Sequence, residues 1–362
     1  MKNIIWLRHE NRPTERRTPL LPRGAELLVN SGYNVIVERS GKRIIPDRAY
    51  AAAGCRMVEG GAWTKAPKEA VILGLKELPD RPPYLKNTHI YFAHAYKEQA
   101  GWQTLLRRFS AGGGSLLDIE YMVDPDGNRV VAFGYRAGYT GAALALIHWY
   151  NRQGGGRRYL DHGLTPFDTA GLLHDCIRQN RLPGKAPKIL VIGASGRCGH
   201  GALDLLSPYE ADITCWGRQQ TRHIDRAALL NHDIVINCAF IREDIPPFIR
   251  RQDLTKDVRL SVIADISCDP FSAFNPVPLY HDVTSWDRPY VTTGTAKAVD
   301  IIAIDNLPSL LPREASEEFA DQMLPHLLTL KMRDRAPVWR AARASFDRAI
   351  AAMDNEKIHA TG

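Results

Sequence analysis

The stretch KILVIGASGRCGHGALDLL, residues 188–206, restricts the possible folds more than any other part of the chain. It combines a β-rich apolar run, a turn with Gly193, Gly196 and Gly199, and a helix expected from about Arg197. Small residues let the backbone approach a pyrophosphate, and the first N–H groups of the helix favour its negative charge. Glycines also serve tight turns and close packing. Because a further strand-like run, ADITCW, follows at residues 211–216, the pattern predicts a dinucleotide site.

Short β-rich runs alternate with helical segments in both halves of the chain, which predicts mostly parallel sheets covered by helices. We expect an α/β fold with two Rossmann-like, doubly wound domains and an interdomain cleft. The substrate and catalytic domain is predicted at residues 1–137 plus about 325–362, and the dinucleotide domain at 138–324. Strands are expected at 3–9, 34–40, 70–77, 89–95, 115–122 and 129–135, then at 188–192, 211–216, 232–240, 260–267 and 290–295.

Helices are expected at 23–31 and 98–109, and a long buried helix at 137–153 is expected to link the two domains. A polar loop should follow at 151–163. The tail from Ser316 has helical periodicity, with an interruption expected at Pro337.

Composition excludes several classes of function. The chain has 362 residues, 44% of them hydrophobic, but no apolar run of the roughly 20 residues that cross a bilayer and no signal-peptide pattern at its start. We therefore predict a cytoplasmic protein without a membrane partner. The net charge of +7 is spread along the chain, which argues against nucleic acid and suits an anionic small molecule. The six cysteines lack metal-site spacing, so we predict reduced thiols and no metal. The oligomeric state stays open between a monomer and a small homo-oligomer.

The segment ITCWGRQQT, residues 213–221, bears on the choice of cofactor. Gly217 lies 24 residues after Gly193, at the end of the second predicted strand, where NAD-binding proteins commonly carry an acid that bonds the ribose. A glycine removes the repulsion of a 2′-phosphate. Arg218, with Arg222 as a second contact, supplies donors to that phosphate. We therefore expect NADP(H) to be preferred over NAD(H); in the alternative, Arg218 points to solvent and the protein uses NAD.

Charged residues follow several predicted strands of the first domain. Lys76 and Glu77 end one strand, and His94 and Lys97 end another. Carboxyl ends of adjacent parallel strands are where ligands bind in open α/β sheets, so these groups could converge. In the alternative without a ligand site, the lysines are solvated loop residues and the histidine is structural. Arg17, beside Glu15 and Arg16 in the first connection, suits a substrate carboxylate, or else forms a surface ion pair.

A family resemblance joins these motifs. RHENRPTERRTPLLP, GLKELP, FAHAYKEQAGWQ, VAFGYRAGYTGAAL, VIGASGRCGHGALDLL, ADISCDPFSAFNPVPLY and LPSLLPREAS occur in this order from about Leu7 to Ile350. Together they resemble the saccharopine dehydrogenases of the L-lysine-forming type, which are related in fold to alanine dehydrogenase. That family converts saccharopine reversibly to lysine and 2-oxoglutarate with NAD.

The resemblance also implies roles for residues. Lys76 and His94 match the acid–base pair, and Glu77 is a charged neighbour of Lys76. The implied substrate-binding residues are Arg17, Glu77, Lys97, Glu120, Arg129 and Phe133. The residues assigned to the cofactor are Gly193, Ser195, Gly196, Arg197, Cys198, Gly199, Gly217, Arg218, Arg222 and Cys238. Cys198 and Cys238 match a pair that can form a disulfide in the family, although thiols are expected in the cytoplasm. Gly217 departs from the family, whose members carry an acid after the tryptophan of this strand.

The residues suit this chemistry. In a cationic, partly desolvated site the pKa of Lys76 would fall, which makes it a plausible base for a secondary amine. His94 suits proton transfer to and from water near neutral pH. Two alternatives stay open: an NADPH-dependent imine reductase that joins a different amine to a 2-oxo acid, and a nucleotide-sensing homologue without turnover.

Overall fold

The computed structural model describes residues 3–96, 101–154, 158–241 and 243–360, with only the backbone for 354–360. The chain divides into two compact units, which are treated separately below. The first unit comprises Met1–Ala132 and Ala315–Gly362, and the second comprises Phe133–Glu314. The interdomain cleft expected from the sequence stays a prediction, as do the roles assigned to the two domains.

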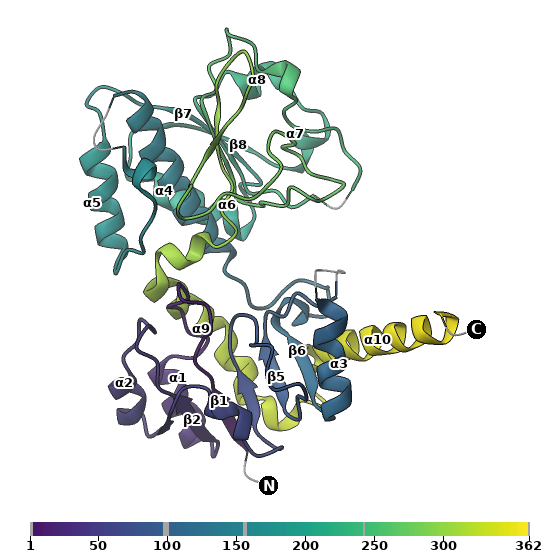
Figure 1. Cartoon of the computed structure of the whole chain (residues 1–362). Helices are drawn as coiled ribbons and strands as arrows, with labels where there is room; N and C mark the ends of the chain where they lie inside the picture. Colours follow the sequence, from purple (N-terminus) through teal and green to yellow (C-terminus); the bar gives the residue numbers. More distant parts are fainter. Residues whose placement is uncertain (1–2, 97–100, 155–157, 242, 361–362) are drawn as a thin grey trace. The chain divides into compact units, whose positions relative to one another are not determined.

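The first unit contains a six-stranded parallel sheet with the strand order β3-β2-β1-β4-β5-β6 (Figure 1). Its strands are β1 Ile4–Leu7, β2 Asn34–Glu38, β3 Arg56–Val58, β4 Val71–Leu73, β5 Thr88–Tyr91 and β6 Ser115–Asp118. The helices are α1 Pro22–Asn30, α2 Asp47–Ala52, α3 Trp102–Gly112, most of α9 Pro312–Leu328, which begins in the second unit, and α10 Pro337–Ala360. The order of strands reverses direction between β1 and β4, which is the point where doubly wound sheets bind ligands.

Burial explains why these segments form strands and helices. All four residues of β1 are buried, as expected for a central parallel strand covered on both faces. In α1, Pro22 occupies the first turn, where its missing N–H costs nothing, and Ala25 and Leu28 face the core. The helix α10 begins at Pro337 for the same reason, and this residue marks the interruption expected in the tail.

One strand expected in the first half is absent. Residues 129–135 were expected to form a strand, but this segment makes only an isolated bridge between Val123 and Arg129, and α4 begins at Gly134. A tight local turn competes with the sheet, because Asp124 N–H donates to Asn128 O at 2.9 Å and Val130 N–H donates to Met122 O at 2.9 Å. The short strand β3 and the helix α2 were not expected from the sequence.

The second unit contains a sheet with the order β11-β12-β10-β9-β7-β8, parallel except for β11. Its strands are β7 Lys188–Ile192, β8 Asp212–Trp216, β9 Ile234–Asn237, β10 Val262–Asp265, β11 Val291–Thr292 and β12 Asp300–Ile302. The helices are α4 Gly134–Arg152, α5 Ala170–Asn180, α6 Arg197–Leu206, α7 Arg218–Arg222 and α8 Arg226–Leu230. The sequence predicted α4 and α6, whereas it missed α5 and β12.

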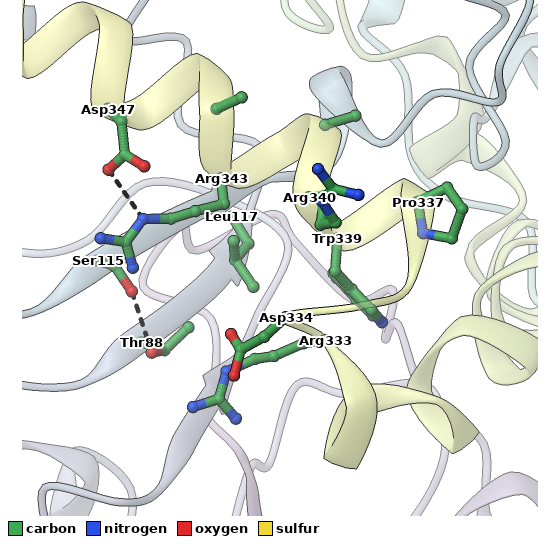
Figure 2. Close-up of a pocket in the computed structure, with 12 residues that line it drawn as sticks. Thr88, Ser115, Leu117, Arg333, Asp334, Pro337, Trp339, Arg340, Arg343 and Asp347 are labelled. Carbon is green, nitrogen blue, oxygen red and sulfur yellow. Dashed lines mark hydrogen bonds and ion pairs between the residues drawn. The ribbon is translucent and has the colours of Figure 1, made fainter.

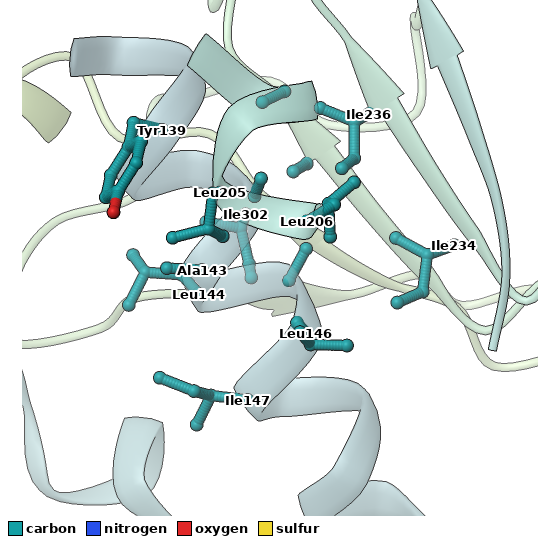
Figure 3. Packing of buried hydrophobic residues seen from close by; sticks show 14 of the residues in the cluster. Tyr139, Ala143, Leu144, Leu146, Ile147, Leu205, Leu206, Ile234, Ile236 and Ile302 are labelled. Atoms are coloured by element: carbon teal, nitrogen blue, oxygen red, sulfur yellow. The ribbon is translucent and has the colours of Figure 1, made fainter. Parts of the chain in front are cut away.

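The core of the second unit is built around α4, which is buried from Gly138 to Asn151 (Figure 3). Apolar side chains of α4, α6 and the strands pack together, among them Leu144, Leu205 and Ile236. The two helices meet at glycines, since a Cβ at Gly138 would lie 1.8 Å from Cys198 O and one at Gly201 would lie 1.9 Å from Tyr135 O. This backbone contact fixes α4 against the helix that follows the glycine-rich turn.

In the described part of the chain, no helix is both long enough and apolar enough to cross a membrane.

Candidate active site and dinucleotide site

Lys76 and His94 leave the same edge of the first sheet. They follow the adjacent parallel strands β4 and β5, which pair Leu73 with Ile90. Beyond the strands the two segments stay hydrogen-bonded, because Phe92 N–H donates to Leu75 O at 3.1 Å. The structure therefore brings the two predicted acid–base residues to one carboxyl edge, as adjacent strand ends require.

Glu77 pairs with an arginine that sequence reasoning did not single out. Arg12 Nε donates to Glu77 Oε2 at 2.7 Å, and Arg12 Nη2 donates to Glu77 Oε1 at 2.6 Å. Burial alone would raise the pKa of Glu77, but backbone hydrogen bonding, Arg12 and the charge of Lys76 together lower it. The acid is thus held ionised beside Lys76.

Arg17 forms a buried ion pair with Glu15, not the surface pair considered as the alternative. Its Nε and Nη2 donate to the two oxygens of Glu15 at 2.8 and 2.7 Å, and the side chains are 2% and 0% exposed. Although burial opposes ionisation, Arg17, with a smaller contribution from Lys76, lowers the pKa of Glu15. Glu15 therefore holds Arg17 in place within reach of the Lys76 charge.

Two further charged side chains, Glu120 and Arg129, lie near His94. Its Nδ1 lies 3.9 Å from Glu120 Oε2, and Glu120 Oε1 lies 3.9 Å from Arg129 Nη1. His94 adopts a φ of 51°, in the left-handed region that non-glycine residues rarely enter, and its side chain is 43% exposed. Such backbone conformations cluster at functional sites, where the surrounding structure enforces them.

Three buried residues that the sequence analysis missed anchor these segments. Glu10 accepts from the backbone N–H groups of Leu75 and Lys76, and Arg8 donates to Lys76 O. Asp118 accepts from Ala93 N–H at 3.3 Å and from Glu120 N–H at 2.9 Å. One signal was available in the sequence, since Arg8 directly follows the apolar strand β1, Glu10 lies two residues further on, and Asp118 ends the apolar strand β6.

The glycine-rich turn has the shape that a pyrophosphate requires. Gly193 has a φ of 78°, and a Cβ at Gly199 would lie 2.4 Å from Gly193 O, so both positions need glycine. The helix α6 begins at Arg197, as predicted, and Ser195, Gly196 and Arg197 are exposed at its start. The turn leaves a backbone cradle that larger residues would fill, and it fits a dinucleotide.

The end of β8 presents Gly217, Arg218 and Arg222 on and around the short helix α7. Gly217 N–H donates to Gln220 Oε1 at 2.9 Å, and both arginines are exposed. A Cβ at Gly217 would approach no atom closer than Gln220 Oε1, at 3.7 Å. The absence of an acid here is therefore not forced by the packing around Gly217.

The two predicted cofactor cysteines are neighbours and are both free thiols. Hydrogen bonding by Cys198, together with burial, raises the pKa of Cys238 well above its ordinary value. Cys238 also lines the turn, because its carbonyl carbon lies 3.0 Å from a Cβ placed at Gly193.

Two further substrate residues were predicted, Phe133 and Lys97. Phe133 begins the second unit, where its carbonyl accepts from Ala137 N–H. Lys97 lies outside the described residues. In the described part of the chain, no group of three or more His, Cys, Asp or Glu side chains is arranged to hold a metal ion.

A cavity of about 550 Å³ in the first unit does not coincide with this site (Figure 2). It lies between α10 and the opposite, amino-terminal ends of β5 and β6, where the hydroxyls of Thr88 and Ser115 are 3.0 Å apart. Arg343 faces it while paired with Asp347 at 2.8 Å. We therefore place the active site by the charged strand ends and not by the volume of this cavity.

The chain is similar to known proteins over nearly its whole length. Two family models match, the alanine dehydrogenase/PNT N-terminal domain at residues 6–140 and the C-terminal domain at 206–359. A curated saccharopine dehydrogenase (NAD(+), L-lysine-forming) of Emericella nidulans is 43% identical, covering 97% of this chain and 98% of its own length. The chain belongs to the L-lysine-forming saccharopine dehydrogenase family. The enzyme of the same name from Yarrowia lipolytica is 41% identical over 96% of this chain and 97% of its own.

Solved structures agree with the fold of this saccharopine dehydrogenase family member. An L-alanine dehydrogenase matches with a TM-score of 0.65 at 16% identity, covering 96% of this chain and 94% of its own. The transhydrogenase from Sinorhizobium meliloti also gives 0.65, at 18% identity, covering 93% of this chain and 97% of its own. The predicted family and the predicted α/β class with two Rossmann-like domains are confirmed.

Proposed function

We propose that this protein catalyses the reversible oxidative deamination of saccharopine to L-lysine and 2-oxoglutarate, with a nicotinamide dinucleotide and water. The observation that carries the proposal is the 43% identity over 97% of the chain to a dehydrogenase of that name. The site supports it, since Lys76 and His94, the residues that match the family's acid–base pair, emerge from adjacent strand ends.

The charge around Lys76 suits a substrate with several carboxylates. Among the described residues, ion pairs and close Coulomb interactions connect five cations with three acids: Arg8, Arg12, Arg17, Lys42 and Lys76 with Glu10, Glu15 and Glu77. The acids hold the arginines in fixed positions, and the excess of positive charge attracts an anion. This arrangement supports the substrate roles proposed for Arg17 and Glu77.

Each acid–base residue then has a task. The turn from Gly193 to Gly199 would hold the dinucleotide, which would supply the hydride acceptor for the carbon beside the secondary amine. Lys76 Nζ takes the proton of that amine, and His94 removes a proton from the water that attacks the resulting imine. Glu120 lies beside His94 Nδ1, where its negative charge stabilises the protonated imidazole.

The deciding experiment measures steady-state turnover of L-lysine and 2-oxoglutarate with NADH and NADPH, followed by a panel of other amines and 2-oxo acids. We expect the highest kcat/KM for lysine with 2-oxoglutarate. A higher value for another pair would identify the protein as a different imine reductase. Dinucleotide binding without any turnover would identify a sensing homologue.

We propose further that NADP(H) is preferred over NAD(H), although the relatives' names specify NAD(+) for those proteins. Gly217 presents no carboxylate to a 2′-phosphate, and Arg218 is exposed beside it. A charge-assisted hydrogen bond of about 1.5–3 kcal/mol corresponds to about a 10- to 150-fold change in preference.

The test is the variant Gly217→Asp with Arg218→Ala, for which the packing leaves room. We expect its ratio of kcat/KM for NADP to that for NAD to fall by about 10- to 150-fold. High salt should weaken the parent's preference in the same direction. A ratio equal to that of the parent would show that Arg218 stays in solvent.

A further inference from the structure

The backbone around Lys76 is held on both sides by one buried ion pair. Glu10 Oε1 accepts from Leu75 N–H at 2.7 Å, and Glu10 Oε2 accepts from Lys76 N–H at 2.9 Å. Arg8 Nη1 lies 3.2 Å from Glu10 Oε2, and Arg8 Nη2 donates to Lys76 O. The N–H and the carbonyl of Lys76 are thus both bound by residues at the end of β1.

Burial makes this arrangement rigid. The side chains of Arg8 and Glu10 are 1% and 6% exposed, so water does not compete for their hydrogen bonds. Hydrogen bonds to charged groups are stronger than neutral ones, and a buried pair that loses one partner leaves an uncompensated charge. The pair therefore resists any displacement of the Lys76 segment.

Gly74, directly after the strand β4, leaves room for the side chain of Arg8. A Cβ at this position would lie 2.3 Å from Arg8 Nε and 2.5 Å from Arg8 Cζ, so the guanidinium lies directly on the glycine backbone. The Cζ of the same guanidinium lies 5.6 Å from the centre of the Tyr91 ring. Gly74 therefore admits the arginine that reaches Lys76 O.

We propose that Arg8 and Glu10 are positioning residues that fix the backbone of Lys76, and thereby the direction from which its amine meets the substrate. This inference rests on the proposed function, in which Lys76 is the base. Neither residue is assigned to contact the substrate. Their effect on catalysis passes through Lys76, because a catalytic group that is misplaced by about 1 Å can lose about 100-fold in rate.

A double-mutant cycle tests this path. Glu10→Gln keeps the shape but loses one acceptor, and it should lower kcat by about 10- to 100-fold while the dinucleotide Kd stays unchanged. In the Lys76→Met background, Glu10→Gln should change the residual kcat by less than about 2-fold, because the group it positions is gone. An equal loss of kcat in both backgrounds would overturn the proposal, since a general structural defect does not depend on Lys76.

The chain offers a matched control in Asp233. This carboxylate also accepts from a backbone N–H, that of Lys188, at 2.8 Å, and pairs with Arg259 at 2.8 Å. It lies at the amino-terminal ends of β7 and β9 in the second unit. Asp233→Asn should lower the melting temperature as Glu10→Gln does, but leave kcat of the folded protein unchanged.

A second variant covers the case in which Glu10→Gln does not fold. Gly74→Ala would push the guanidinium away from Lys76 O, and it should lower kcat in the same Lys76-dependent way. Gly41→Ala is its control, because a Cβ at Gly41 meets no atom within 4 Å. Normal kcat in folded Gly74→Ala would count against the proposal.

Hydrogen exchange separates this proposal from the proposed reaction. If the parent binds the dinucleotide but does not turn over lysine and 2-oxoglutarate, the proposed reaction is refuted. The positioning role of Arg8 and Glu10 still predicts slow exchange at the amides of Leu75 and Lys76 in that case. Exchange there should become faster in Glu10→Gln and stay slow in Asp233→Asn. Equal exchange rates at these amides in the parent and in Glu10→Gln would overturn the positioning role of Arg8 and Glu10.

Discussion

The carboxyl edges of the two sheets differ in the groups that they present to a ligand. In the first unit, the edge carries charged side chains whose positions are set by buried ion pairs, such as Arg17 with Glu15. In the second unit, the edge is a backbone turn, shaped by Gly193 and Gly199. Under the proposed function, the first arrangement recognises a substrate through side-chain charge, and the second accepts a phosphate through the absence of side chains. Substitutions should therefore impair ligand binding for opposite reasons. In the first unit they remove charged atoms, and in the second unit they add atoms that fill the turn.

The largest effect is expected at Lys76. Lys76→Met removes the proposed base while keeping the length of the side chain, and it should lower kcat by about 100- to 10,000-fold. Dinucleotide Kd, measured by fluorescence titration, should not change. Lys65→Met, at an exposed lysine of the same unit, is the control and should leave both quantities unchanged. A comparable loss of dinucleotide affinity in Lys76→Met would contradict the division of tasks between the two edges.

The next effect concerns the buried pair of Arg17 and Glu15. Arg17→Ala leaves the Glu15 carboxylate buried without this arginine, which should destabilise the protein by about 3–5 kcal/mol in urea unfolding. The control is Arg23→Ala, whose partner Asp321 lies 2.6 Å away in an exposed pair. Its loss should cost less than about 1 kcal/mol.

Arg17 also has a proposed functional role, and KM separates the two. In the fraction of Arg17→Ala that folds, KM for 2-oxoglutarate should rise by about 10-fold if the guanidinium binds a substrate carboxylate. Destabilisation with an unchanged KM would make the pair purely structural.

A smaller effect is expected when a methyl group is added to the turn. In Gly199→Ala the new Cβ would lie 2.4 Å from Gly193 O and 2.5 Å from Ala194 Cα, so the backbone must shift. Strain of about 1–3 kcal/mol should raise the dinucleotide Kd by about 5- to 150-fold. Gly171→Ala, on the exposed face of α5, is the control. Unchanged affinity in Gly199→Ala would show that the shape of the turn does not determine binding.

The smallest effect concerns acid stability. Because the pKa of Glu15 in the folded protein lies below its ordinary value of 4.5, its contribution to stability is complete above that pH and is lost as the pH falls through the lower, folded value. The melting temperature of the parent should therefore fall more steeply below about pH 4.5 than that of Glu15→Gln with Arg17→Met. If the melting temperatures of the parent and of this variant fall in parallel with pH, the pair does not contribute to the loss of stability in acid. Glu26→Gln, at an exposed position of α1, should follow the parent.

Much of the fold could be predicted because it depends on local patterns. The apolar run and glycines of residues 188–199 are contiguous, so the strand, turn and helix were expected in the right places. The strand expected at 129–135 was wrong because apolar content does not reveal the competing turn at Asp124. Arg8 and Glu10 were missed for another reason. Their partners lie more than 60 residues away and meet them only through the pairing of β1 with β4.

The meeting of α4 and α6 has a consequence for how this sequence can diverge. At Gly138 and Gly201 every side chain would collide with a carbonyl of the opposing helix, and no rotamer can relieve a collision that involves Cβ itself. A mutational library selected only for folding should thus retain glycine alone at these two positions, while Gly217 accepts many residues. Descendants of this protein could change the nucleotide they use at Gly217, but could not change the helix crossing one residue at a time.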